Sequence, residues 1–214
     1  MLTIWGRRNS SNVQKVMWSL GEIGHDHVRV DAGGAFGGLD APDFLARNPH
    51  GLIPVIDDDG TIVWESNAIV RYVCARYSAG DLWPVDPRAR AAADRWMDWA
   101  VTTLQPAFMT FFWGWYRTPP AQRDAARNTA SLAQSHHAFG RLDQALADRP
   151  FLAGDHLTMA DIPAGAMAFR YYTLEIARPD RPHLRAWYER LVQRAAYRDH
   201  VMVPYDDLRG RLAF

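Results

Sequence analysis

This chain has almost no cysteine, no long apolar segment and no excess of charge of either sign. Cys74 is the only cysteine among 214 residues, which excludes an intrachain disulfide and a CxxC dithiol redox cycle. No apolar run approaches the roughly 20 residues that a membrane-spanning helix needs. The segment MLTIWGRRNSS lacks the apolar core and cleavage site of a signal peptide. Together these absences predict a protein of the reducing cytosol with no membrane partner.

The charge balance also limits the partners. Lys plus Arg and Asp plus Glu both number 24, so the formal net charge is zero. Nucleic-acid-binding proteins normally have a basic face or stripe, and we therefore expect no nucleic-acid partner. The eight histidines are scattered without an HExxH-type spacing, so we expect no metal. Cys74 falls among apolar residues at helical spacing, which indicates a small buried hydrophobic side chain.

The pattern of predicted elements changes near residue 78. Before that point short strands alternate with helices, which is typical of an α/β unit with a partly parallel sheet. The predicted strands are 2–5, 27–31, 53–56 and 61–64, and the predicted helices are 12–24, 42–47 and 66–77. A Gly- and Pro-bearing segment follows, and helical periodicity then dominates, with about five helices. The sequence predicts an α/β domain over 1–78, a linker over 79–86 and an all-α domain over 87–214.

The most informative segment is NPHGLIPVIDDDGTIVWESNAIVRY, residues 48–72. Pro54 interrupts an apolar run and cannot donate to a sheet ladder, so it belongs at a strand start, an edge or a bulge. A cis Ile53–Pro54 bond would turn the preceding backbone polar groups toward a ligand. The turn residues 57–60 predict a hairpin. Ser66 is placed to cap the helix that follows, and a helix N-terminus is a natural carboxylate site.

The ordered pair NPxGxIP and ESxAIxRY resembles the glutathione-binding domain of cytosolic glutathione S-transferases, in particular bacterial, serine-type members similar to the theta, phi and zeta classes. The resemblance implies a thioredoxin-like N-terminal domain followed by an all-helical bundle that contains the hydrophobic substrate site. It implies glutathione as co-substrate and a homodimer. It also implies that the backbone of Ile53, next to cis Pro54, pairs with the cysteinyl unit, that Glu65 and Ser66 hold the γ-glutamyl carboxylate, and that His50 lies near the cysteinyl-glycine end.

Glutathione chemistry requires a thiolate, because the thiol is a poor nucleophile. Ser10 and Ser11 immediately precede a helical pattern, where a hydroxyl and the helix N-terminus can stabilise the sulfur anion. The resemblance places Ser10 at the catalytic position, with Ser11 and Asn12 as alternatives. No tyrosine lies near the end of the first strand, and no cysteine occupies the Ser10 region. The tyrosine-type and thiol-exchange classes are therefore disfavoured.

The second substrate is expected to meet the helical half. Residues 108–116 contain six aromatic side chains, more than one helix buries on a single face. We expect Phe111 and Trp115 to line an apolar pocket, Tyr116 or Arg117 to supply a polar contact, and Phe112 to belong to the core. We expect the C-terminal segment from 205 either to fold back over this pocket or, as the default, to fray.

Two further features come from the helical half. Thr158, followed three residues later by Asp161, predicts a helix start with an acidic variant of the capping box, and the family has such a helix-initiating motif. In relatives an acidic residue on the first helix of this domain reaches glutathione in the partner subunit, and Asp94 and Asp98 are the candidates.

The resulting hypothesis is an enzyme of detoxification in which a serine hydrogen bond activates the glutathione thiol for attack on an apolar electrophile. The same fold also supports glutathione-dependent peroxidases, disulfide-bond reductases and dehalogenases, and non-catalytic binding or assembly proteins. A full set of candidate glutathione-binding residues argues against the non-catalytic alternative.

Overall fold

A four-stranded sheet with the order β2-β1-β3-β4 organises the first part of the chain in the computed structural model, which describes residues 1–212. The strands are β1 (Leu2–Trp5), β2 (His27–Val30), β3 (Val55–Asp58) and β4 (Thr61–Trp64). β1 pairs parallel with β2 and antiparallel with β3, and β3 pairs antiparallel with β4. The predicted mixed sheet and the 57–60 hairpin are confirmed.

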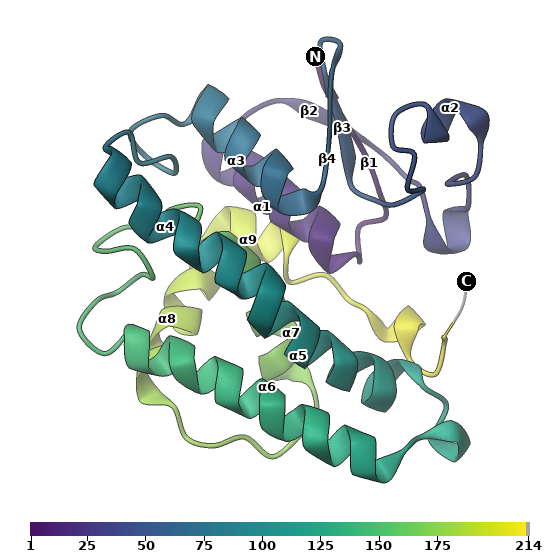
Figure 1. Ribbon diagram of the computed structural model, residues 1–214, viewed down its shortest axis with the longest axis vertical. Coiled ribbons are helices and arrows are strands. Elements are labelled where there is room, and N and C mark those ends of the chain that lie inside the picture. The colour runs from purple at the N-terminus through teal and green to yellow at the C-terminus, as the bar shows by residue number, and fades with distance from the viewer. Residues whose placement is uncertain (213–214) are drawn as a thin grey trace.

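Helices cover both faces of this sheet (Figure 1). Leu2 and Ile4 of β1 alternate with outward residues and are fully buried in the main core with α1 (Ser11–Ile23) and α3 (Ser66–Tyr77). Val55 points to the other face and packs with Phe44 of the short helix α2 (Pro42–Leu45) in a smaller cluster. The thioredoxin-like arrangement of the first part of the chain is therefore as predicted.

The backbone is unusual at both ends of the hairpin. The Ile53–Pro54 bond is cis, and β3 begins directly after it, so the missing N–H of Pro54 interrupts no ladder. Glu65, which directly follows β4, has φ of 68° although it is not glycine. Such a conformation costs on the order of 1–3 kcal/mol and is found mainly at functional sites. Both segments that the sequence marks for ligand binding thus have special backbone geometry.

The second part of the chain is entirely helical. Residues 87–117 form one rod in which α4 (Pro87–Trp99) and α5 (Gln105–Phe111) are each followed by a π-helical stretch, Ala100–Leu104 and Phe112–Arg117. Pro106 lacks the N–H that a regular α-helix uses, which explains a widened turn just before it. The remaining helices are α6 (Ala125–Ala145), α7 (Asp161–Thr173), α8 (Pro182–Val192) and α9 (Ala195–His200). No helix among the described residues is both long and apolar enough to cross a membrane.

Helix α1 joins the two parts, because it contacts α3 on one side and α7 and α9 on the other. Trp18 of α1 is fully buried at this contact. A Cβ added at Gly165 of α7 would lie 2.5 Å from the Trp18 ring, so α7 needs glycine there to approach α1. Cys74 is fully buried as predicted, and burial raises the pKa of its thiol to about 12, which keeps the thiol protonated and unreactive.

The start of α7 differs slightly from the predicted cap. The helix begins at Asp161, and the Thr158 hydroxyl accepts from the Ala160 N–H at 3.3 Å within the preceding turn. The Asp161 carboxylate accepts from the backbone N–H of Thr158 and Leu152 and from the Trp187 indole N–H. Asp161 therefore connects the helix start to two other segments, which is more than a helix cap does.

Candidate functional site

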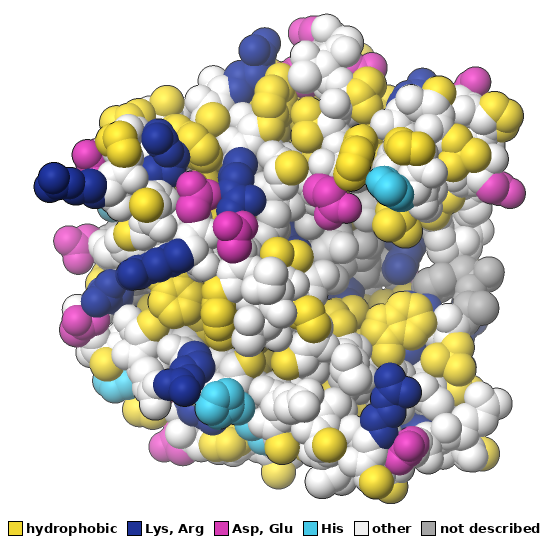
Figure 2. Space-filling model, viewed as in Figure 1, with side chains coloured by type: hydrophobic (Ala, Val, Ile, Leu, Met, Phe, Trp, Pro, Cys, Tyr) yellow, Lys and Arg dark blue, Asp and Glu magenta, His cyan; other side chains and the backbone are white. Residues whose placement is uncertain are grey.

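A cavity of about 390 Å³ lies where the α/β part faces the helical rod. Three residues at the start of α1, Ser10, Ser11 and Asn12, line it together with Ile53. Figure 2 shows a recess between the upper and lower parts of the molecule with basic side chains inside it. The structure thus brings together the candidate thiol activators and the residue before the cis proline.

Ser10 is the N-cap residue of α1. Its carbonyl accepts from the Gln14 N–H at 2.9 Å, while its own N–H donates to the Arg7 carbonyl at 3.1 Å. Among the described residues its hydroxyl makes no capping hydrogen bond, although serine often caps in this way. The hydroxyl therefore lies at a helix N-terminus, lines a cavity and is not committed to the helix. Ser11, the first helical residue, is only 6% exposed.

A chain of polar side chains connects Asn12 to Ser66 through the interior. Gln105 Nε2 donates to Asn12 Oδ1 at 3.1 Å, and Lys15 Nζ donates to Gln105 Oε1 at 2.7 Å. Lys15 Nζ also donates to Ser66 Oγ, at 3.3 Å, which brings the chain to the start of α3. Gln105 comes from the helical rod and the others from the α/β part. The predicted thiol site at the start of α1 and the predicted carboxylate site at the start of α3 are thus linked through Gln105 of the helical rod.

Lys15 is the only lysine in the chain, and the other 23 basic side chains are arginines. It is fully buried, and burial lowers its pKa from 10.5 to about 7, with Glu65 acting in the opposite direction. An arginine could not lose its proton in this position, whereas a lysine can. The amine is therefore a titratable group near neutral pH inside the protein.

The other predicted glutathione-binding residues lie beyond this cavity. Ser66 is 6% exposed at the first position of α3, and Glu65 is exposed directly before it. The exposed His50 has its ring centroid 5.0 Å from that of Trp64, and its N–H donates to Asn48 Oδ1. Lys15 and Gln105 connect Ser66 to the cavity, and Asn48 connects His50 to it, because Asn48 Nδ2 donates to the carbonyl of Leu52, which lines the cavity.

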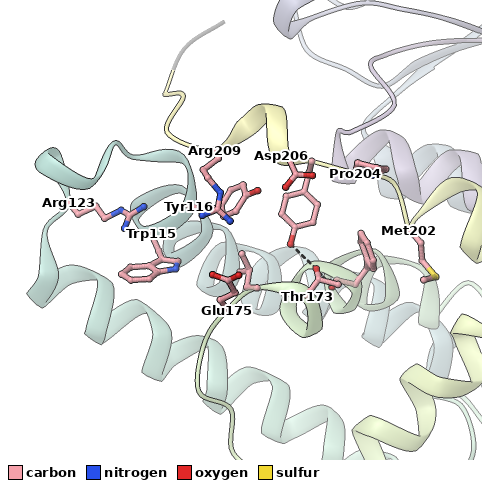
Figure 3. A pocket seen from close by; sticks show the side chains of 12 residues that line it. Trp115, Tyr116, Arg123, Thr173, Glu175, Met202, Pro204, Asp206 and Arg209 are labelled. Atoms are coloured by element: carbon pink, nitrogen blue, oxygen red, sulfur yellow. Dashed lines mark hydrogen bonds between the residues drawn. The ribbon is translucent and has the colours of Figure 1, made fainter.

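The aromatic residues predicted for the substrate pocket lie elsewhere. Phe111 and Trp115 stack with centroids 6.3 Å apart and line a separate groove on the helical part. Trp115 and Tyr116 also line the cavity in Figure 3, together with Arg123, Arg209 and Glu175. None of the three is among the residues that line the Ser10 cavity. In this structure Phe111, Trp115 and Tyr116 therefore line other pockets, and their contact with the second substrate stays a prediction.

Met109, Phe112 and Trp113 supply the apolar wall in their place. Trp113 is 39% exposed, while Phe112 is fully buried, as expected for a core residue, and yet borders the cavity. Arg117, one of the two residues expected to supply a polar contact, does line this cavity, whereas sequence reasoning missed other polar and charged lining residues, among them Gln105 and Arg170. For Lys15 one signal was present, namely a single lysine on the apolar side of an amphipathic helix.

The described part of the C-terminal segment is held in place, contrary to the expected fraying. Asn9 Nδ2 donates to Asp207 at 2.7 Å, the Gly210 N–H donates to the Tyr116 carbonyl at 2.9 Å, and Arg117 Nε donates to the Arg211 carbonyl at 2.8 Å. Leu208 lines the Ser10 cavity. Residues 205–212 therefore form part of the wall of the site.

Two remaining expectations concern metals and the partner subunit. Within residues 1–212 no three His, Cys, Asp or Glu side chains gather as they would around a metal ion. Arg71 bonds to both candidate acidic residues on α4, with Nε 2.7 Å from Asp94 and Nη2 in contact with Asp98. These two carboxylates are therefore engaged within the chain.

Family models for the two domains of glutathione S-transferases match this chain. The N-terminal domain model covers residues 1–75 and the C-terminal domain model covers residues 97–195. Glutathione S-transferase GstB of Escherichia coli K12 is 41% identical over 206 residues, which span 95% of this chain and 99% of that protein. Glutathione S-transferase 3 of Zea mays is 30% identical and covers 94% of this chain and 93% of its own length.

The chain is also similar to a solved structure. A theta class glutathione S-transferase from Xanthomonas axonopodis pv. citri, with glutathione bound, is 48% identical and superimposes with a TM-score of 0.91. The match covers 95% of this chain and 98% of that one.

Proposed function

The chain belongs to the glutathione S-transferase family, and from this premise we propose that it transfers the glutathione thiolate to an electrophile in the cavity lined by Ser10. The observation that supports this most directly is the Ser10 hydroxyl, which lies at the N-terminus of α1 and makes no capping bond among the described residues. A donor in this place stabilises a sulfur anion better than the thiol, and so lowers the thiol pKa.

The proposed reaction has two steps. Glutathione loses its thiol proton to solvent, and the Ser10 O–H donates to the resulting thiolate while the end of α1 adds partial positive charge. The thiolate then attacks the electrophilic carbon, forming the C–S bond as the leaving group departs with its electron pair. Ser10 acts as a hydrogen-bond donor throughout and forms no covalent bond.

Ser10 is preferred over its two neighbours for structural reasons. The Asn12 Oδ1 atom accepts from Gln105, which ties this side chain to the helical rod. Ser11 is the first residue inside the helix and is 6% exposed, compared with a half-buried Ser10. Both line the same cavity, so they remain the alternatives that a mutational test must include.

The same proposal assigns residues to each part of the glutathione tripeptide. The backbone of Ile53 beside cis Pro54 would pair with the cysteinyl unit, and the α3 N-terminus with Glu65 and Ser66 would hold the γ-glutamyl carboxylate. His50 would lie at the cysteinyl-glycine end. The family resemblance also supports a homodimer, in which Asp94 or Asp98 would reach the partner's glutathione.

The test is an ultraviolet pH titration of enzyme-bound glutathione, which detects the thiolate by its absorbance. The wild type and Ser10→Ala are compared, with Ser11→Ala and Asn12→Ala as matched controls. We expect the bound thiol to ionise well below the pKa of free glutathione in the wild type and in both controls, but not in Ser10→Ala. A Ser10→Ala enzyme that keeps the thiolate would transfer the role to a neighbour. Glutathione that binds without ionising would refute the proposed activity.

A further inference from the structure

Three arginines line the cavity that holds Ser10, and they come from three separate parts of the chain. Arg7 precedes α1, Arg117 ends the helical rod and Arg170 lies on α7. No carboxylate is among the described residues that line this cavity. Asp207, which accepts from Asn9, is an acidic residue that acts on Arg7 and Arg117. The lining of this cavity is thus both aromatic and basic.

Two of the guanidinium groups lie against aromatic rings. The Arg117 guanidinium carbon is 3.7 Å from the Trp113 ring centroid, and that of Arg170 is 4.8 Å from the Phe112 centroid. Arg170 also donates through Nη2 to the Asn9 carbonyl at 2.5 Å. Stacking holds the plane of a guanidinium and leaves its N–H edge as the donor surface. The cations are therefore fixed in position beside apolar rings.

Burial makes the position of Arg170 costly without an acceptor for its Nε–H. Arg170 is 2% exposed, and its buried Nε has no hydrogen-bond partner among the described residues. Burial lowers the pKa of Arg170 and of Arg117 to about 10, and repulsion from Arg7 acts in the same direction on both. A buried donor without an acceptor is unfavourable, and an anion in the cavity would relieve both this deficit and the repulsion.

We propose that Arg7, Arg117 and Arg170 form a subsite for a carboxylate on the electrophile, so that the preferred second substrate is an aromatic or similarly apolar molecule with an acidic group. The proposal rests on the proposed transferase function and narrows its substrate class. Met109, Phe112 and Trp113 would contact the apolar body of the substrate. Guanidinium groups bind carboxylates with strong, directional hydrogen bonds.

The probes are 4-chloro-3,5-dinitrobenzoate and its neutral amide, which share one ring and one leaving group. In each the thiolate would form a C–S bond at the chlorinated carbon, and chloride would leave with the C–Cl electron pair. Isothermal titration calorimetry without glutathione measures binding of each compound. Chloride release with glutathione present measures turnover, and comparing the acid-to-amide ratio of kcat/KM between variants cancels the difference in intrinsic reactivity.

Arg7 and Arg8 provide a matched pair of variants. Arg7 is partly buried and lines the cavity, while its neighbour Arg8 is exposed and bonds to the Asp199 carbonyl at 2.8 Å. Arg7→Gln removes one cation of the subsite, Arg7→Lys keeps the charge, and Arg8→Gln removes a charge outside the cavity. Arg170→Gln is less suitable as the first variant because this fully buried side chain also supports the Asn9 loop.

We expect the wild type to bind the acid about tenfold more tightly than it binds the amide, and we expect the same ratio for Arg8→Gln. Arg7→Gln should lose most of this advantage, and Arg7→Lys should recover part of it. Equal binding of acid and amide to the wild type would overturn the proposal. So would an Arg7→Gln enzyme that binds glutathione more weakly but keeps the acid-to-amide ratio, because the arginines would then serve the glycyl carboxylate of glutathione.

Different results would refute the transferase function and the carboxylate subsite. Release of chloride from the amide without any preference for the acid would support the transferase and refute the carboxylate subsite. Tight, Arg7-dependent binding of the acid with no turnover of either compound would support the subsite and refute the transferase.

Discussion

Lys15 of α1 donates to Gln105 of α5 at 2.7 Å, so that an amine from the α/β part and an amide from the helical part meet inside the protein. Lys15 also contacts Ser66, and Gln105 also contacts Asn12. The proposed γ-glutamyl carboxylate site at Ser66 and the proposed thiol site at the start of α1 therefore both depend on this buried contact between Lys15 and Gln105.

Stability should depend on pH through Lys15. Its pKa is about 7 when folded and near 10.5 when exposed, so the unfolded chain binds more protons between these values. Stability linked to this group is therefore fully present above pH 10.5 and is lost as the pH falls toward 7. Relative to Lys15→Met, the wild type should gain roughly 1.4 kcal/mol per pH unit above about pH 7.5.

Urea unfolding of both proteins at several values between pH 7 and pH 9.5 measures this difference. A stability difference that does not change over this range would show that the amine is not desolvated in solution. Selective ¹⁵N labelling of lysine provides an independent check, since the chain has one lysine and would give one side-chain signal to titrate.

Ser66→Ala should weaken glutathione binding about tenfold, because a buried carboxylate of the ligand would lose one donor. Turnover at saturating glutathione should change much less, since the thiol lies at the other end of the polar chain. Calorimetric titration with glutathione measures the affinity. Ser19→Ala is the control, because it removes a buried α1 hydroxyl that bonds to the Lys15 carbonyl within its own helix. Equal affinity of the two variants for glutathione would contradict the assignment of Ser66.

Trp113 and Trp115 allow a direct test of which face of the helical rod binds the electrophile. They are similarly exposed, at 39% and 37%, but only Trp113 lines the Ser10 cavity. Trp113→Ala should raise the KM for the electrophile several-fold without changing glutathione affinity, because apolar contact area is lost. Trp115→Ala should leave both parameters close to wild type. A larger effect from Trp115→Ala than from Trp113→Ala would instead support the substrate pocket predicted around Phe111 and Trp115.

Asp161→Asn should lower the free energy of unfolding by about 2–3 kcal/mol. The carboxylate accepts from two backbone N–H groups and the Trp187 indole, and an amide would direct an NH₂ group at one of these donors. Thr158→Ala should cost about 1 kcal/mol, since it removes one turn hydrogen bond. Thermal or urea unfolding measures both changes, and equal losses would mean that Asp161 acts only as a helix cap.

The segment 48–72 was predictable because its information is local. Turn residues, a proline before a strand and a hydroxyl at a helix start each limit the backbone without help from distant residues. The hairpin and the helix start at residues 65–66 were predicted in this way, although the N-cap is Glu65 and Ser66 is the first helical residue. The cis Ile53–Pro54 bond was implied by the family resemblance, since a proline alone does not establish it.

The wall of the cavity was not predictable by the same means. Aromatic residues occur on every side of 108–116, so the composition does not identify one face. Met109, Trp113 and Arg117, which line the cavity, are spaced by four, and so are Phe111 and Trp115 on the other face, so helical spacing does not distinguish the two sets. An analysis based on α-helical spacing selected Phe111 and Trp115 on another face.

Lys15 was missed for a different reason. A lysine in an amphipathic helix is normally solvated, and its burial depends on partners 51 and 90 residues away in the chain. The place of Lys15 on the apolar side of its helix is a local signal of burial, but it does not identify these partners.

The burial of the single lysine also determines how this protein meets amine-directed reagents. With Lys15 enclosed, no lysine amine lies on the surface of this chain. Bifunctional cross-linkers aimed at lysine would find no target in the folded protein, so a negative cross-linking result says nothing about its oligomeric state. A lysine target would appear only when α1 separates from the helical rod, which makes the rate of Lys15 acylation a measure of how often the two parts come apart.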